Sequence, residues 1–260
     1  MALPTALSLA LAGCGSGVDP QVSSKSRFRA QAMSYAPTHK VKPSEAIDHS
    51  KDFDIHGIDV SKYQGNIDWQ AVAGSDVRFA WIKATEGADH LDSKFRENWA
   101  GAKAAGVPRG AYHFVYWCRP WHEEMAWFKT NVPRDADALP PVLDVEATPE
   151  SRTCKRTIVR EQAIPEMRQM LQDMERHYGK RPIIYTTVDF YEAILSDGAL
   201  NDYPIWVRST KDRPHVRYGS RKWHFWQYQS DGHTPGIRGP VDRNVFHGTS
   251  SEWRKWLASN

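Results

Sequence analysis

The sequence predicts an α/β protein with an irregular TIM-like barrel. Three observations carry this prediction. Eight short apolar runs between residues 57 and 246 have the continuity expected of strands covered on both faces. Helix-periodic segments separate the earlier runs, and such alternation implies a parallel sheet with right-handed crossovers. After the fifth run the connections become polar or rich in Gly and Pro, so the last third departs from a regular eightfold repeat.

The expected strands are short and rich in β-branched and aromatic residues, and turn residues separate several of them. They cover residues 57–61, 79–85, 110–117, 140–146, 183–187, 204–207, 224–229 and 241–246.

The expected helices are defined by their end signals. Ser93 is a helix cap and Gly106 a stop, and Gly179 ends a longer segment in the same way. Pro165 is expected to kink that longer helix or to mark a second start. The helices are expected at residues 93–106, 121–132, 158–179, 189–195 and 251–257.

The N-terminal residues indicate targeting. Residues 2–13 form an uncharged, mostly apolar run that is too short to span a membrane. The run ends in LAGC, which resembles a bacterial lipoprotein signal with Cys14 as the lipidated residue, although no Lys or Arg precedes it. The alternative is an unremarkable apolar leader or a plain signal peptide. Either interpretation predicts export, to the bacterial cell envelope (periplasm or outer-membrane lipoprotein) or as a secreted protein.

The domain organisation follows from composition. Residues 1–14 are interpreted as the signal segment, residues 15–54 as a polar flexible tether, and residues 55–260 as one barrel domain. The only membrane association expected is a lipid anchor at Cys14, and a monomer is expected.

Cysteine usage agrees with export. If Cys14 carries lipid, Cys118 and Cys154 remain, and each follows a strand-like run. They are either a disulfide, which needs an oxidising compartment, or two free thiols.

Composition limits the class of partner. A net charge of +3 is compatible with an anionic cell-wall polymer but falls short of a nucleic-acid-binding signature, so no nucleic-acid partner is expected. Eleven tryptophans and ten tyrosines offer stacking faces for sugars. We find no HExxH motif, paired Cys/His spacing, phosphate loop or dinucleotide fingerprint, so neither a metal nor another cofactor is expected.

Four acids lie at strand ends, where barrel enzymes carry their active sites. Asp59 lies near the end of the first run, Asp144 and Glu146 end the fourth, and Asp242 lies in the eighth. Alternate residues of a strand share one face, so Asp144 and Glu146 point the same way. Asp59 and Asp242 approach each other because the first and last strands of a closed barrel are neighbours.

Two carboxyl groups that differ in burial suit glycoside cleavage. One remains protonated and donates to the leaving oxygen, while the other stabilises positive charge on the sugar. The alternative is a solvated strand end or a salt-bridged pair with a structural role.

Several segments together resemble glycoside hydrolase family 25, the lysozymes that are N-acetylmuramidases. The most specific are DVSKYQG, LDVE and VDRN, which occur in the family's order. The resemblance implies a barrel of five βα units followed by three strands, and peptidoglycan glycan strands as the partner. It also implies cleavage of the β-1,4 bond between N-acetylmuramic acid and N-acetylglucosamine.

By position, the resemblance makes Glu146 the general acid/base. Asp144 would orient the substrate's N-acetyl group in a retaining reaction. The further substrate-binding candidates are Asp59, Asp242, Tyr112, Gln227, Trp206, Lys83 and Glu86, the last two being either glycan contacts or a local ion pair.

Two functional alternatives stay open. One is a non-catalytic glycan-binding protein on the same fold, although a binder has no need of both acids. The other is a chitinase-like hydrolase, although the expected D-x-x-D-x-D-x-E run is absent because residue 142 is Val.

Two further positions need interpretation. Arg208 stands where a small residue is expected and begins a basic loop, residues 208–222, that either meets anionic peptidoglycan or is merely solvated. His113 follows Tyr112 and should face the other way, as a core histidine.

Overall fold

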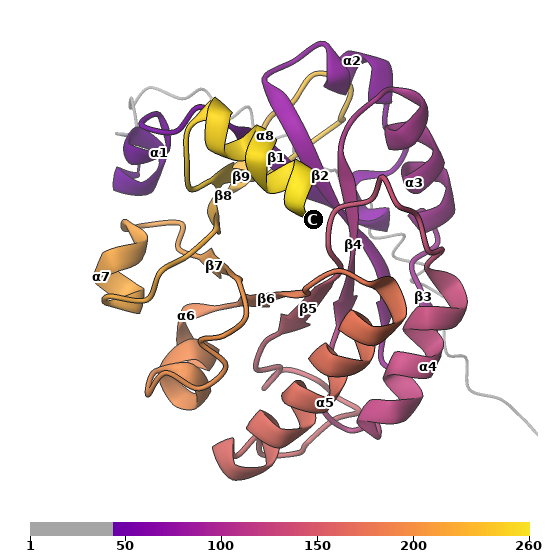
Figure 1. Cartoon of the computed structure of the whole chain (residues 1–260), viewed down its shortest axis with the longest axis vertical. Coiled ribbons are helices and arrows are strands. Elements are labelled where there is room, and N and C mark those ends of the chain that lie inside the picture. Colours follow the sequence, from indigo (N-terminus) through magenta and orange to yellow (C-terminus); the bar gives the residue numbers. More distant parts are fainter. Residues whose placement is uncertain (1–43) are drawn as a thin grey trace, which may run out of the picture. The chain divides into compact units, whose positions relative to one another are not determined.

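The computed structural model describes residues 44–260, which fold around a closed β-barrel (Figure 1). The strand order is β1-β9-β8-β7-β6-β5-β4-β2, and a further pairing of β1 with β2 closes the barrel. The short β3 adds to the edge of β2. The irregular barrel predicted from the sequence is therefore confirmed.

All the expected strands are present, within a few residues at each end. They are β1 (His56–Val60), β2 (Val77–Glu86), β4 (Arg109–Phe114), β5 (Val142–Val145), β6 (Ile183–Thr186), β7 (Ile205–Arg208), β8 (Phe225–Gly232) and β9 (Val241–Phe246), with β3 (His90–Leu91) in addition.

Strand β9 runs against its neighbours. Its pairings with β1 and β8 are antiparallel, whereas the other barrel pairings are parallel. The start of β9 therefore lies at the barrel end where the other strands finish. Asp242 reaches this end from the beginning of its strand, and not from the carboxyl end that the sequence suggested.

The five expected helices are also present. Pro165 lies inside a single helix, α5, so it does not start a second one. The segment expected at residues 189–195 is a short α-turn followed by a π-helical turn. The helices are α3 (Phe95–Ala104), α4 (Trp121–Asn131), α5 (Arg160–Tyr178), α6 (Val188–Phe190) with η2 (Tyr191–Leu195), and α8 (Ser250–Ser259).

Short helices that the sequence did not suggest complete the unit. They are α1 (Glu45–Ser50), η1 (Lys62–Gln64), α2 (Trp69–Ala73) and α7 (Pro214–Tyr218). Helix α1 falls in the segment interpreted as tether, yet Ala46 is buried and its amide donates to the carbonyl of Lys211 at 3.2 Å. Helix α1 has only about one and a half turns and few apolar residues, so its sequence shows no helical hydrophobic periodicity. The signal segment, Cys14 and most of the tether lie outside the described residues.

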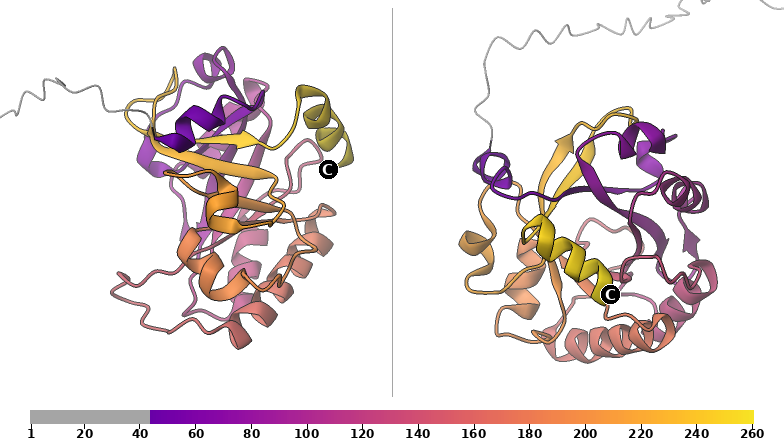
Figure 2. Two further views of the ribbon diagram at one scale, coloured as in Figure 1. Left: turned by 90° about the vertical axis from the view of Figure 1, so that its left-hand side faces the viewer. Right: turned by 45° about the horizontal axis from the view of Figure 1, so that its top comes forward.

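Aromatic side chains fill the barrel interior below the mouth. Trp81 stacks on Trp206 at a centroid distance of 5.7 Å, and Phe225 packs edge-on against Phe79 at 5.2 Å. Trp253 of α8 packs against Phe79 at 5.4 Å, and α8 crosses one end of the barrel (Figure 2). Side chains of α8 therefore pack over this end of the barrel interior.

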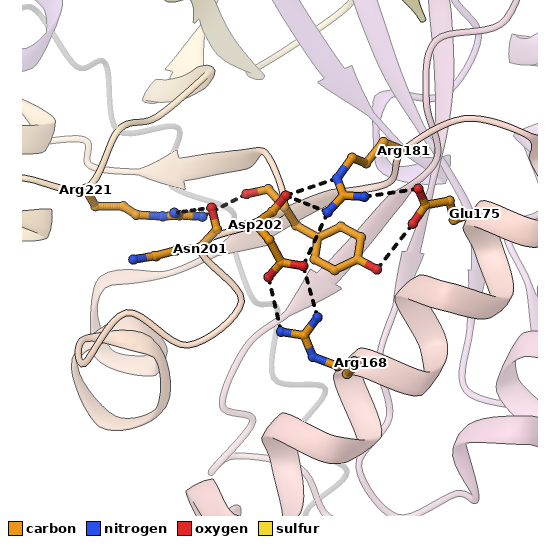
Figure 3. Close-up of polar contacts among 7 residues, drawn as sticks. Arg168, Glu175, Arg181, Asn201, Asp202 and Arg221 are labelled. Carbon is orange, nitrogen blue, oxygen red and sulfur yellow. Dashed lines mark hydrogen bonds and ion pairs between the residues drawn. The ribbon is translucent and has the colours of Figure 1, made fainter.

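On the outside, helix α5 is held by a polar cluster. Arg168 donates to both carboxylate oxygens of Asp202, at 3.0 and 3.1 Å, and Arg181 donates to the Asp202 carbonyl at 2.7 Å (Figure 3). Tyr203 donates to Glu175 of α5 at 3.3 Å. These contacts fix the connection before β7 without touching the barrel mouth. No helix within residues 44–260 combines the length and apolar character that a membrane crossing requires.

Candidate active site

A cavity of about 280 Å³ opens at the barrel end where β1, β5 and β7 finish and β9 begins. Side chains from eight barrel strands or the residues directly after them line it. Most of the residues that the sequence singled out lie here together: Asp59, Asp144, Glu146, Asp242, Tyr112, Gln227, Trp206 and Lys83.

Glu86 is the exception among the predicted site residues. It does not line the cavity, and its carboxylate accepts a hydrogen bond from Lys83 at 2.7 Å. The sequence left a glycan contact and a local ion pair open for Lys83 and Glu86, and the structure shows the ion pair.

The first wall of the cavity is the end of β5. Leu143 and Val145 are fully buried in the layer between barrel and helices, while Asp144 and Glu146 line the cavity. Burial raises the pKa of Asp144 well above its usual value, and the charge of Glu146 adds to this effect. Burial also raises the pKa of Glu146. The two carboxyl groups interact directly, so the pair retains a shared proton to higher pH than ordinary carboxyl groups do.

The Asp144 side chain is incompletely hydrogen-bonded. Its Oδ1 is buried and has no partner within the described part of the chain. A buried acceptor without a donor is costly, so this atom is available to a donor on a ligand.

The second wall is the junction of β1 and β9. Asp59 and Asp242 are directly paired across the two strands. Asp59 Oδ2 accepts hydrogen bonds from Gln227 Nε2 at 2.9 Å and Asn244 Nδ2 at 2.8 Å. Burial raises the pKa of Asp59 to about 6, against the opposing effect of these two donors. Burial and the charge of Asp59 raise the pKa of Asp242 to about 8.

Neighbouring side chains fix the two amides. Tyr185 donates to Gln227 Oε1 at 2.9 Å, and the indole of Trp206 donates to Asn244 Oδ1 at 2.9 Å. Each amide oxygen is thus an acceptor, which leaves the amide nitrogen to donate to Asp59. This network holds Asp59 in one orientation.

Two tyrosines remain protonated in the cavity. Burial raises the pKa of Tyr112 and of Tyr185 well above the usual value, and nearby carboxylates strengthen both shifts. Both hydroxyl groups therefore keep their protons at any ordinary pH. The Tyr185 hydroxyl uses its proton in the bond to Gln227, and the Tyr112 hydroxyl can donate to a ligand.

Loops after β4 and β5 brace the position of Glu146. Cys118 and Cys154 form a disulfide with a Cα–Cα distance of 5.6 Å, which settles the choice between a disulfide and free thiols. The Trp117 indole donates to the Glu146 carbonyl at 2.9 Å, and Arg156 donates to the Trp117 carbonyl at 2.9 Å.

His113 is a core residue, as its alternation with Tyr112 predicted. It is fully buried, with Nδ1 at 2.7 Å from the Thr85 hydroxyl and Nε2 at 2.8 Å from Glu124. Among residues 44–260 no group of three or more His, Cys, Asp or Glu side chains has an arrangement that could hold a metal ion.

Sequence reasoning missed part of the site. Asn244 lies two residues after Asp242 on the same strand face, and Tyr185 ends an apolar run at the mouth, so alternation could have found both. Tyr63 and Gln64 line the cavity from η1, and Tyr63 is 81% exposed. Their position depends on a turn that strand patterns do not specify.

Comparisons with known proteins agree with this arrangement. The family model described as glycosyl hydrolases family 25 matches residues 58–237. The uncharacterized protein YegX of Escherichia coli (strain K12) is 38% identical over 219 residues, which cover 82% of this chain and 77% of YegX. Lysozyme M1 of Streptomyces globisporus is 35% identical over 211 residues, covering 76% of this chain and 69% of its own. The structure of a family 25 glycosyl hydrolase from Bacillus anthracis has a TM-score of 0.72 and 36% identity, and the match covers 78% of this chain and 94% of that one.

Proposed function

Because the chain belongs to glycosyl hydrolase family 25 and is a glycoside hydrolase, we propose that it is a peptidoglycan-cleaving N-acetylmuramidase. The bond cleaved is the β-1,4 linkage between N-acetylmuramic acid and N-acetylglucosamine. The observation that carries this proposal is the interacting pair Asp144 and Glu146 at the open end of the barrel, with Asp59 and Asp242 in the same cavity.

In the first step, Glu146 gives its proton to the glycosidic oxygen as the bond to the sugar carbon breaks. The substrate's own acetamido oxygen attacks that carbon and forms a cyclic intermediate, so no enzyme nucleophile is needed. Asp144 accepts a hydrogen bond from the acetamido N–H, which supplies the donor that its buried Oδ1 lacks. This contact stabilises ionised Asp144 and shifts the shared proton toward Glu146.

In the second step, Glu146, now ionised, takes a proton from water, and the water oxygen attacks the same sugar carbon. The acetamido group is released unchanged, and the sugar keeps its anomeric configuration. Tyr112 contributes a hydroxyl donor beside the reacting sugar, and Trp206 contributes part of the aromatic floor.

The proposal is tested by incubating the full chain with purified peptidoglycan and quantifying new reducing ends on muramic acid. We expect release by the wild type and a loss of at least about 1,000-fold in Glu146→Gln, which keeps the side-chain size but cannot donate the proton. Proton NMR of the first product identifies the anomer, and the β-anomer is expected.

Other outcomes identify the alternatives. Binding to peptidoglycan without release of reducing ends indicates a glycan-binding protein. Cleavage of chitin but not of peptidoglycan indicates a chitinase-like hydrolase. The α-anomer as first product contradicts the retaining route.

We further propose that the enzyme is exported and acts in the cell envelope, with Cys14 carrying a lipid. The disulfide Cys118–Cys154 supports an oxidising compartment. Metabolic labelling with radioactive palmitate tests the anchor: the full-length protein should be labelled and a Cys14→Ala variant should not.

A further inference from the structure

Arg208 is a cation in the cavity whose side chain is not committed to a partner. It ends β7, where it pairs in register with Gln227, and its carbonyl accepts a hydrogen bond from Tyr218 at 2.6 Å. Its backbone is thus fixed, and its half-buried side chain lines the cavity. Within residues 44–260 its guanidinium makes no hydrogen bond or salt bridge, and it acts on Asp59, Glu146 and Asp242 through its charge alone.

The other cation of the cavity is already engaged. Lys83 pairs with Glu86 at 2.7 Å and lies over the ring of Phe114 at 4.8 Å. A ligand that carries a negative charge would therefore meet Arg208 as the available cationic group.

The acids around Arg208 do not rule out such a ligand. The positive charge of Arg208 lowers the pKa of Asp59, Glu146 and Asp242, yet burial keeps each pKa above its usual value. With the pKa of Asp242 at about 8, this carboxyl group is largely uncharged at neutral pH. The cavity therefore carries less negative charge than its carboxyl count suggests.

We propose that Arg208 binds a carboxylate on the side group of the muramic acid residue and selects muramyl substrates over chitin. This inference rests on the proposed function and names the substrate group that the site recognises. Muramic acid differs from N-acetylglucosamine by a lactyl ether. The lactyl group ends in a free carboxylate in peptide-free strands, and in intact peptidoglycan it continues into a peptide that bears other carboxylates. Chitin carries neither, and a guanidinium matches a carboxylate with two parallel hydrogen bonds.

The test compares three glycan substrates with the full chain. They are intact peptidoglycan, amidase-treated strands with free lactyl carboxylates, and the same strands after carbodiimide coupling to methylamine, which removes the charge. We expect Arg208→Gln to lower kcat/KM by about 10- to 100-fold on charged strands and by less than about twofold on neutralised strands, as for loss of one charge-assisted hydrogen-bond pair. A larger loss on amidase-treated strands assigns the lactyl carboxylate, and a larger loss on intact peptidoglycan assigns the peptide.

Two variants separate recognition from general electrostatics. Arg208→Lys keeps the charge but loses the planar fork, so it should recover only part of the activity on charged strands. Lys211→Gln removes an exposed cation from the same loop and should behave as the wild type.

Equal losses of Arg208→Gln on charged and neutralised strands would mean that Arg208 acts only on the enzyme's own acids, and would overturn the inference. So would unchanged activity of Arg208→Gln on every substrate. A wild type that cleaves none of the three strands refutes the proposed function itself, which is a different result.

Discussion

The two walls of the cavity hold their carboxyl groups in opposite ways. On the β1–β9 wall, Asp59 accepts two amide hydrogen bonds, and both amides are fixed by further donors. On the β5 wall, Asp144 has a buried oxygen without a donor and shares its environment with Glu146. The β5 wall is stabilised through its backbone instead, because the Trp117 indole donates a hydrogen bond to the Glu146 carbonyl.

The difference indicates a division of labour. A carboxylate with its hydrogen bonds already satisfied is a fixed charge that shapes the field of the cavity. A carboxyl pair that has only its shared proton gains most from a ligand that supplies a further donor, and that proton can move between the two groups. We therefore expect substitutions on the β5 wall to act on the reaction, and substitutions on the β1–β9 wall to act first on stability and on pH dependence.

After Glu146→Gln, the largest expected effect comes from Asp144→Asn. The amide keeps the shape of the side chain but removes the charge that stabilises the acetamido group, so kcat should fall by about 100- to 1,000-fold with a small change in KM. Steady-state kinetics on solubilised peptidoglycan measures this. Asp242→Asn is the matched control on the β1–β9 wall. An equal loss of kcat in both variants would contradict the proposed division of roles between the two walls.

The disulfide is expected to matter mainly for stability. Cys118 and Cys154 are separated by 36 residues, and opening a loop of this size costs about 2–4 kcal/mol. The double variant Cys118→Ser/Cys154→Ser should therefore have a Tm lower by about 5–15 °C. Activity measured well below that Tm should fall only severalfold, through looser placement of Glu146. Unchanged Tm in the double variant would show that the brace is not stabilising.

Asn244→Ala tests the hydrogen-bond network around Asp59 on the β1–β9 wall. It leaves Asp59 with one donor and the Trp206 indole with none, so the expected loss is about 1–3 kcal/mol of unfolding free energy. Removing the donor also raises the pKa of Asp59 further, which should displace the pH–activity profile. Asn98→Ala is the control, because buried Asn98 accepts from Trp69 at 3.4 Å in the helix layer. It should lose stability and keep the profile, whereas displaced profiles in both variants would contradict the assignment.

Asp242→Asn should stabilise the protein by an amount that grows as pH rises from about 4 to about 8. The pKa of Asp242 is raised to about 8 from an ordinary value of 3.8, so the folded state binds this proton more tightly than the unfolded state. The resulting stability is complete only below the ordinary value of 3.8 and is lost progressively until pH reaches about 8. The Tm of Asp242→Asn should therefore be close to that of the wild type near pH 4 and exceed it by a growing margin up to about pH 8, with about 2–4 °C for each kcal/mol. A Tm difference that shrinks as pH rises would reverse the sign and contradict the burial argument.

The smallest effect is expected on the outside of the barrel. Arg168→Ala removes an exposed ion pair with Asp202 (Figure 3), so unfolding free energy should fall by at most about 1 kcal/mol. Cleavage of peptidoglycan should be unchanged. A marked loss of cleavage would show that helix α5 transmits strain to Glu146.

The sequence predicted the barrel and most of its mouth because both depend on local patterns. Alternation placed Asp144 and Glu146 on one face, and closure of the barrel brought Asp59 beside Asp242. The sequence did not predict the direction of β9 or the short helices η1 and α1, because these features depend on turns and on tertiary packing rather than on hydrophobic periodicity.

The hydrogen-bonding state of each acid could not be read from the sequence either. Asp59 and Asp144 occupy equivalent strand-end positions, and only the tertiary contacts of Gln227 and Asn244 distinguish them. Glu86 shows the same limit: its strand position left a glycan contact and a local ion pair equally open, and the structure shows the ion pair with Lys83.

The central claim is that Glu146 donates the proton and Asp144 serves the acetamido group. The most direct measurement compares cleavage of peptidoglycan strands with cleavage of a dinitrophenyl glycoside of the same N-acetylated sugar, whose leaving group needs no proton. Glu146→Gln should lose at least about 1,000-fold on the strands but far less in the release of dinitrophenol, while Asp144→Asn should lose heavily on both. Equal losses of Glu146→Gln on the two substrates would contradict its role as the acid.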